Sequence, residues 1–219
     1  MSTLKNLAVP SDPSRLPVTL QRLADKRRHG EPVVMVTAYD HPSAIAADRA
    51  GVDMVLVGDS GAMTVLGYDS TVPVTLDELL VLARAVRRGL TTPFMVGDLP
   101  FGSYEVSDKQ AVKTALRFVK EAGCDAVKLE GGGPLSVSRA RAIVQAGIPV
   151  MGHVGLTPQT STALGGYKAQ GRTAEGATRV RSEALALQEA GCFSIVFEAI
   201  PSAVATAIMP EMDALIIGI

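Results

Sequence analysis

The chain has 219 residues, enough for one sizeable core, with a formal net charge of -1 at pH 7 and a pI of about 6.3. This balance gives no electrostatic basis for binding nucleic acid or an anionic membrane surface. No apolar run approaches the ~18 residues of a membrane span, and the N-terminus has no signal-like apolar segment, so we expect a cytoplasmic protein. Aromatic residues are only 4% of the chain, so aliphatic side chains must fill the core.

Residues 1–17 are polar and interrupted by three prolines, which predicts an arm with little structure of its own. The remainder, residues 18–219, is expected to form a single domain. Thr19 is a plausible N-cap for a basic helix that Gly30 and Pro32 would end. A helix placed before the first strand would suit a plug at one mouth of a barrel.

Short apolar runs then alternate with helical patterns. The predicted strands are Val33–Thr37, Met54–Val57, Phe94–Val96, Ala126–Leu129, Val150–Gly152, Ser194–Phe197 and Ala214–Ile217. The predicted helices are Ser43–Ala50, Leu76–Arg88, Ser107–Ala122, Pro134–Ala146, Ala174–Ala190 and Pro201–Ile208. Ser107 and Ser136 are candidate caps. Four helices run into an Ala-Gly pair whose glycine suits a left-handed helix end.

Strands that are apolar on both faces and alternate with helices indicate a parallel sheet. A doubly wound open sheet would carry a glycine-rich phosphate turn after the first strand, but residues 37–40 read Thr-Ala-Tyr-Asp. Ionisable residues follow nearly every strand, which favours a ring. We therefore predict an α/β fold of the TIM (β/α)8 barrel type. The pattern reaches only seven strands, so we expect a barrel that is truncated, open or completed by another chain.

Three acidic residues follow neighbouring predicted strands at the end where parallel barrels carry their chemistry. They are Asp59, Asp98 and Glu130. Adjacent strands lie ~4.8 Å apart, so the three carboxylates should converge. Hard oxygen ligands without a Cys or His cluster point to Mg²⁺. The alternative is that each acid caps a helix or bonds a loop amide.

Three further residues close strands at this end. Lys128 is two residues before Glu130 and should point to the same side, where it would stabilise an enolate or simply pair with Glu130. His153 would either make a structural hydrogen bond or contact substrate. Glu198 lies among apolar residues, as suits a general acid/base, unless it caps the helix predicted at Pro201.

Other features are ambiguous. The loop 165–172 is glycine-rich and basic, and would be a lid, an anion contact or a plain connector. Gly131-Gly132-Gly133 would allow either close approach to a ligand or a sharp turn. Cys124 and Cys192 lie at equivalent strand starts and are expected to be buried, inert thiols.

Several motifs occur together in order from about residue 18. They are Thr37-Ala38-Tyr39-Asp40, Val57-Gly58-Asp59-Ser60, Asp98-Leu99-Pro100-Phe101, Val127-Lys128-Leu129-Glu130-Gly131, Gly152-His153-Val154-Gly155-Leu156-Thr157-Pro158-Gln159 and Gly165-Gly166-Tyr167-Lys168. This set closely resembles the ketopantoate hydroxymethyltransferase (3-methyl-2-oxobutanoate hydroxymethyltransferase) family.

The resemblance implies a barrel of the phosphoenolpyruvate/pyruvate-like superfamily, Mg²⁺ dependence, 5,10-methylenetetrahydrofolate as co-substrate and a homo-oligomer, often a decamer. By motif, Asp59, Asp98 and Glu130 match the metal positions, and Asp59, Ser60, Asp98 and Lys128 match the ketoacid site. Glu198 matches the proton-transfer residue. The implied reaction gives ketopantoate through a Mg²⁺-stabilised enolate, in pantothenate and coenzyme A biosynthesis.

Two alternatives remain at this point. One is another Mg²⁺-dependent C–C lyase or mutase of the superfamily acting on a different α-ketoacid, although such enzymes typically carry a cysteine-bearing mobile loop. The other is an inactive, truncated barrel, because family members continue beyond Ile219 with a further strand and helix. Continuation of the coding sequence past that residue would separate these cases.

Overall fold

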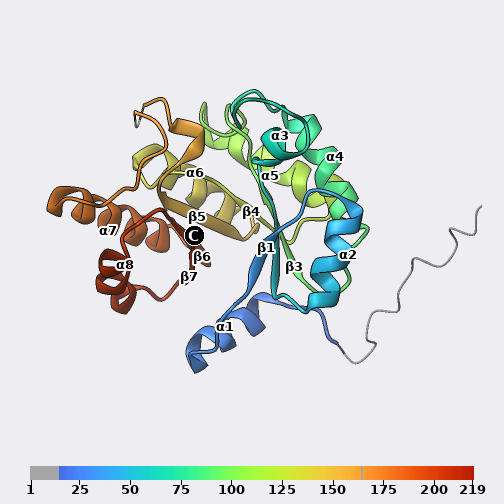
Figure 1. The fold of residues 1–219 in the computed structure, drawn as a ribbon, viewed down its shortest axis with the longest axis horizontal. Helices are drawn as coiled ribbons and strands as arrows, with labels where there is room; N and C mark the ends of the chain where they lie inside the picture. The colour runs from blue at the N-terminus through green and yellow to red at the C-terminus, as the bar shows by residue number, and fades with distance from the viewer. Residues whose placement is uncertain (1–14, 164) are drawn as a thin grey trace, which may run out of the picture.

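Residues 15–163 and 165–219 are described by a computed structural model (Figure 1). Most of the arm predicted over residues 1–17 lies outside the described residues. No helix among the described residues is long and apolar enough to cross a membrane.

Over residues 15–163 and 165–219, seven parallel strands form one sheet, and each strand pairs with the next one in sequence. They are β1 (Met35–Thr37), β2 (Met54–Val57), β3 (Phe94–Asp98), β4 (Ala126–Lys128), β5 (Val150–Gly155), β6 (Ser194–Glu198) and β7 (Leu215–Gly218). A doubly wound sheet reverses its strand order partway, so the sequential order excludes that alternative. The predicted α/β barrel is confirmed, with β1 and β7 at the two ends of the curved sheet.

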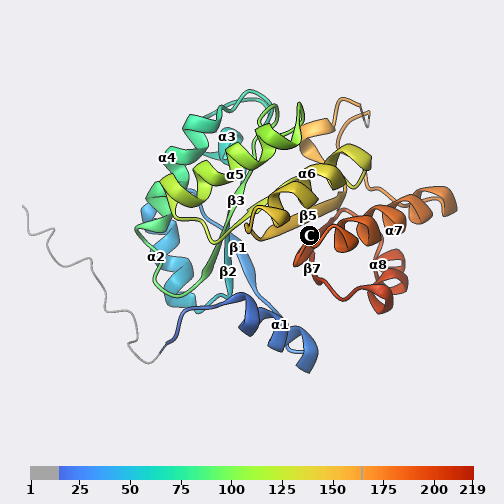
Figure 2. The same cartoon turned by 180° about the vertical axis from the view of Figure 1, so that it is seen from behind.

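Most of the helices cover the outer face of the sheet (Figures 1 and 2). They are α1 (Leu20–His29), α2 (His41–Ala50), α3 (Gly61–Thr64), α4 (Leu76–Arg87), α5 (Asp108–Ala122), α6 (Pro134–Gln145), α7 (Ala174–Glu189) and α8 (Ser202–Ile208), with 3-10 turns η2 (Pro158–Thr160) and η3 (Met209–Glu211). The short α3, η2 and η3 were not predicted, because a single turn leaves no periodic pattern in the sequence.

Side-chain caps explain where most helices begin. Thr19 and Ser107 accept hydrogen bonds from the backbone amides of Arg22 and Gln110, as predicted. The helix expected to begin at Ser43 begins earlier, at His41, because Asp40 caps it. The prediction that Ser136 is a cap was wrong. Its helix begins at Pro134, and the Ser136 hydroxyl donates instead to the Glu130 carbonyl at 3.0 Å.

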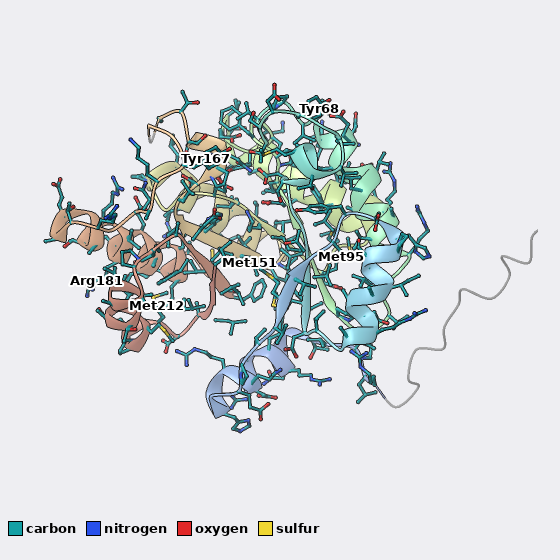
Figure 3. The ribbon with its side chains drawn as sticks, viewed as in Figure 1. Tyr68, Met95, Met151, Tyr167, Arg181 and Met212 are labelled. Carbon is teal, nitrogen blue, oxygen red and sulfur yellow. The ribbon has the colours of Figure 1, made fainter. Side chains whose placement is uncertain are left out.

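Two apolar clusters make up the core. The larger one fills the space between the strands and the surrounding helices. The smaller one lies inside the barrel and includes Met54, Val96 and Met151, with Met151 labelled in Figure 3. Leu23 of α1 is 2% exposed and belongs to the inner cluster. The predicted plug is therefore present, and α1 lies at the opposite end of the strands from α3 (Figure 1).

Four strands, β3, β5, β6 and β7, end later than their apolar runs predicted, whereas β4 ends one residue earlier, at Lys128. β3 includes Asp98, which pairs with Lys128 of β4, and β5 runs to Gly155, which pairs with Glu198 at the end of β6. The backbone ladder tolerates polar side chains where these point into a shared site. Asp98, Lys128, His153 and Glu198 therefore lie on strands, whereas Asp59 and Glu130 lie two residues beyond the ends of β2 and β4.

Candidate active site at the carboxyl ends of the strands

The three acids predicted to converge are brought together and buried. Asp59, Asp98 and Glu130 have exposed fractions of only 4%, 1% and 5%. The backbone amide of Asp59 donates to Asp98 Oδ2 at 3.2 Å, so the ends of β2 and β3 are directly connected. None of the three caps the helix that follows it. Asp98 and Glu130 each accept a backbone N–H, from Asp59 and Gln159, so the predicted alternative of bonding to a loop amide holds for these two acids.

A residue that the sequence reasoning did not single out connects two of these acids. The Gln159 side-chain amide donates to Asp59 Oδ2 at 3.0 Å, and the Gln159 backbone N–H donates to Glu130 Oε2 at 3.1 Å. The Tyr104 hydroxyl donates to Gln159 Oε1 at 2.7 Å. Gln159 did stand in a quoted motif, but a neutral side chain on a short turn carries no charge pattern that would mark it.

Lys128 is the buried cation of the cluster. Its Nζ lies 2.7 Å from Asp98 Oδ1 and 3.8 Å from Glu130 Oε1, and the side chain is 4% exposed. The nearby carboxylates outweigh burial and raise the pKa of Lys128, which keeps it charged. Both sequence alternatives are therefore compatible: Lys128 pairs with acids and also faces the site.

Burial is the main influence on the pKa values of two of the acids, and it raises both. It raises the pKa of Asp98 to about 7, against the opposing attraction of Lys128. It likewise raises the pKa of Glu130 to about 8. Three carboxylates share one lysine, so their mutual repulsion adds to the cost of ionising them without another cation.

His153 connects Lys128 with Glu198. Its Nδ1 lies 3.5 Å from Lys128 Nζ and its Nε2 lies 3.2 Å from Glu198 Oε2, although the latter contact lacks hydrogen-bond geometry. Burial lowers the pKa of His153, so the ring is neutral at pH 7. A lysine ammonium has no acceptor, so Nδ1 faces it without a proton and the N–H on Nε2 faces Glu198. The imidazole is 2% exposed.

Glu198 is the most accessible acid of the group, with its side chain 22% exposed. The capping alternative for it was wrong, because Pro201 occupies the N-cap position of α8 and no side-chain cap bond is present there. Ser60 follows Asp59 at the start of α3, and its Oγ is 2.8 Å from the Tyr39 hydroxyl. Tyr39 also belonged to a quoted motif without being predicted as a site residue.

The donor set suits a divalent cation of the Mg²⁺ type. Asp98 Oδ1 is buried and lies 2.7 Å from Lys128 Nζ without an aligned hydrogen bond, so this oxygen could bind a cation while it stays beside the lysine. Within the described ranges no three His, Cys, Asp or Glu side chains are arranged to enclose a metal by themselves. Mg²⁺ does not require such a cage, because it is usually held by one or two carboxylates together with waters and substrate oxygens. The predicted metal roles of Asp59, Asp98 and Glu130 remain predictions.

The remaining sequence features have structural explanations. A Cβ on Gly132 would lie 2.3 Å from Glu183 Cβ, so this glycine allows α7 to approach closely. Gly131 has φ +89°, which favours glycine. Cys124 and Cys192 are free and buried, as predicted, and burial raises the pKa of each thiol to about 12. In the loop 165–172, Tyr167 is 57% exposed, and the three alternatives of a lid, an anion contact and a plain connector stay untested.

Comparison with solved structures agrees with the fold. A putative phosphonomutase from Burkholderia cenocepacia has a TM-score of 0.73 at 15% identity, covering 91% of this chain and 82% of that one. Phosphonopyruvate hydrolase with oxalate and Mg²⁺ has a TM-score of 0.68 at 13% identity, covering 91% and 71%. A 2,3-dimethylmalate lyase of the PEP mutase/isocitrate lyase superfamily has a TM-score of 0.61 at 18% identity, covering 88% and 68%. At these identities the likeness extends to the fold alone.

Comparison of sequences is more specific. The chain is 56% identical over 202 residues to "3-methyl-2-oxobutanoate hydroxymethyltransferase 1, mitochondrial" of rice, covering 92% of this chain and 56% of that protein. It is 52% identical to the enzyme of the same name from Moorella thermoacetica, covering 92% and 75%. It spans only between about half and three fifths of the plant relatives' length. Residues 17–219 match the family described as ketopantoate hydroxymethyltransferase, and the chain belongs to that family.

Proposed function

We propose that this protein transfers a hydroxymethyl group from 5,10-methylenetetrahydrofolate to 3-methyl-2-oxobutanoate, giving ketopantoate. The observation that supports this most is the buried cluster of Asp59, Asp98, Glu130 and Lys128 at the carboxyl ends of β2 to β4, in a chain of this family. In the balanced reaction, C3 of the ketoacid loses a proton and forms a bond to the methylene carbon. The folate nitrogens leave that carbon, and water supplies the new hydroxyl.

Asp59 and Asp98, with Glu130 beside them, would hold the Mg²⁺ ion. Bound there, the ion would supply Lewis acidity toward the carboxylate and keto oxygens of the substrate, making the C3–H more acidic. Lys128 adds a fixed positive charge in a buried site, where its interaction with a developing enolate oxygen is stronger than in water. Ser60 lies next to Asp59 and is proposed to contact the ketoacid.

Glu198 is the candidate for proton transfer. It is the acid most open to solvent in the group, so a proton it takes up can leave. His153 lies between Lys128 and Glu198 and presents its N–H edge to the Glu198 carboxylate. We propose that the imidazole positions Glu198, with Lys128 on its other side. This assigns His153 to orienting the base, and leaves direct contact with substrate as a second role to be tested.

The decisive experiment follows the C3 proton separately from the transfer. NMR should detect Mg²⁺-dependent exchange of the C3 proton of 3-methyl-2-oxobutanoate in D₂O without folate, and ketopantoate should form once 5,10-methylenetetrahydrofolate is added. Exchange without transfer would confine the proposal to enolisation. Turnover of oxaloacetate or phosphonopyruvate, with no C3 exchange, would favour a lyase or mutase instead. No reaction with any of these would indicate an inactive barrel.

The pathway, the oligomeric state and the cellular location of the protein are also proposed. Ketopantoate formation would place the protein in pantothenate and coenzyme A biosynthesis, and a homo-oligomer is expected. The cytoplasmic location stays a prediction, since the names of the plant relatives place those proteins in mitochondria. Light scattering of the purified protein would test assembly, and fractionation of the source cells would test the compartment.

A further inference from the structure

Gln159 has every polar side-chain atom engaged although it lies in a turn. It is the middle residue of η2, shortly after β5, and is 4% exposed. Its Nε2 donates to Asp59 Oδ2 at 3.0 Å and to the Leu99 carbonyl at 2.9 Å. Its Oε1 accepts from the Tyr104 hydroxyl at 2.7 Å. A buried amide satisfied in this way is fixed in orientation, because any rotation leaves polar atoms unpaired.

The partners of Gln159 belong to different strands. Asp59 follows β2, Leu99 follows β3, and Glu130, which accepts from the Gln159 backbone N–H, follows β4. The turn after β5 therefore makes hydrogen bonds to the segments that follow the carboxyl ends of β2, β3 and β4. On Asp59 and Glu130 it occupies a single carboxylate oxygen, Oδ2 and Oε2 respectively.

A hydrogen bond from Tyr104 fixes the orientation of the Gln159 amide. The Tyr104 hydroxyl donates to Gln159 Oε1, so the donating NH₂ end must face Asp59. The same hydroxyl accepts from the Glu130 backbone N–H at 3.2 Å. Arg139 of α6 is buried and donates to the carbonyls of Tyr104 and Glu105 at 3.1 and 3.0 Å, which holds this loop against the barrel.

We propose that Gln159 is a positioning residue that holds Asp59 and Glu130 in the arrangement that binds a divalent cation, with Tyr104 fixing its amide. This inference rests on the proposed cation site. Removing a group that hydrogen-bonds to a metal-binding side chain typically lowers metal affinity about ten- to a hundredfold. Replacing the side chain removes its bonds to Asp59, Leu99 and Tyr104 but keeps the bond to Glu130, because that bond comes from the backbone.

Two variants of the full chain separate the hydrogen bond from the packing. Gln159→Met keeps the length of the side chain but removes its donors and acceptor. Gln188→Met is the matched control, since the Gln188 amide accepts from the backbone of Asp213 and Ala214 near the start of β7 and contacts none of the acids. Mn²⁺ binding, followed by electron paramagnetic resonance, reports the site without turnover, and thermal unfolding reports the fold.

We expect Gln159→Met to bind Mn²⁺ about tenfold or more weakly, whereas Gln188→Met should bind Mn²⁺ like the wild type. Gln159→Met leaves buried polar partners without their bonds and lowers the unfolding midpoint, so the affinities are measured at a temperature at which both variants are folded. Unchanged Mn²⁺ affinity in Gln159→Met would overturn the inference, as would a wild-type protein with no saturable Mn²⁺ site. Gln159-dependent Mn²⁺ binding in a wild type that fails to exchange the C3 proton would support the inference while refuting the proposed function.

Discussion

Lys128 and Asp98 are register partners on neighbouring strands, and their side chains form a buried ion pair with Nζ and Oδ1 2.7 Å apart. The pair lies between the acids proposed to hold the cation and the imidazole that leads to Glu198. Buried pairs of this kind contribute little net stability, because desolvation offsets the attraction. Their value here is to fix a positive charge where an enolate would form.

Replacing Asp98 by Asn should abolish enolisation. The amide keeps the shape of the side chain but removes the negative charge that pairs with Lys128 and that a cation would use. We expect Mg²⁺-dependent C3 deuterium exchange to fall by about two orders of magnitude or more. Asp213→Asn, at an exposed position, is the control and should exchange normally. Unchanged exchange in Asp98→Asn would remove Asp98 from the cation site.

Replacing Lys128 by Met should impair the reaction and further raise the pKa of Asp98, since Lys128 is the main group that lowers it. We expect C3 exchange to fall about a hundredfold or more. The variant should lose more stability at pH 8 than at pH 6, because uncompensated acids can protonate at the lower pH. Lys113→Met, at an exposed site, is the matched control. Equal destabilisation at both pH values would contradict this account of the charge balance.

Replacing Glu198 by Gln should separate proton transfer from cation binding. Loss of a general base typically costs about 10²- to 10⁴-fold in rate, so we expect C3 exchange to fall within that range. Mn²⁺ affinity should stay at the wild-type value, because Glu198 lies beyond His153 from the three acids. A parallel loss of Mn²⁺ binding would show instead that Glu198 shapes the cation site.

The metal-free protein should lose stability as pH rises. Burial raises the folded-state pKa values of Asp98 to about 7 and Glu130 to about 8, above their unfolded values near ~4. The folded protein therefore binds more protons than the unfolded chain between these limits. The stabilising contribution is complete below pH ~4 and disappears as pH rises through 7 to 8, at about 1.4 kcal/mol per unit of pKa difference for an ideal site.

Chemical denaturation of metal-free protein between pH 5 and 8 measures this effect. Glu130→Gln should flatten the decline, whereas Glu211→Gln should leave it unchanged, since Glu211 is exposed and its pKa is lowered by Arg181. Added Mg²⁺ should restore stability at pH 8 by binding the ionised acids. A wild-type stability that rises over this range would show that the acids ionise freely in the fold.

The two cysteines should be unreactive in the folded state. Burial raises both thiol pKa values to about 12, so almost no thiolate exists at neutral pH. A colorimetric disulfide reagent should label them only at the rate of unfolding, and the labelling should accelerate in parallel with a destabilising change such as Gln188→Met. Fast labelling of the native protein would indicate local opening at these strand starts.

Sequence by itself determined the parallel α/β barrel and the strand ends that carry Asp59, Asp98, Glu130 and Glu198, because apolar runs, helix periodicity and caps such as Thr19 are local signals. Only the tertiary structure decided where β3 and β5 end, since ladder pairing carries them through Asp98 and His153. It also decided the roles of Tyr104 and Gln159, because a neutral amide 100 residues from Asp59 in the chain acquires its partner only when the barrel curves. Contacts of that kind depend on the packing of distant loops, which no local pattern encodes.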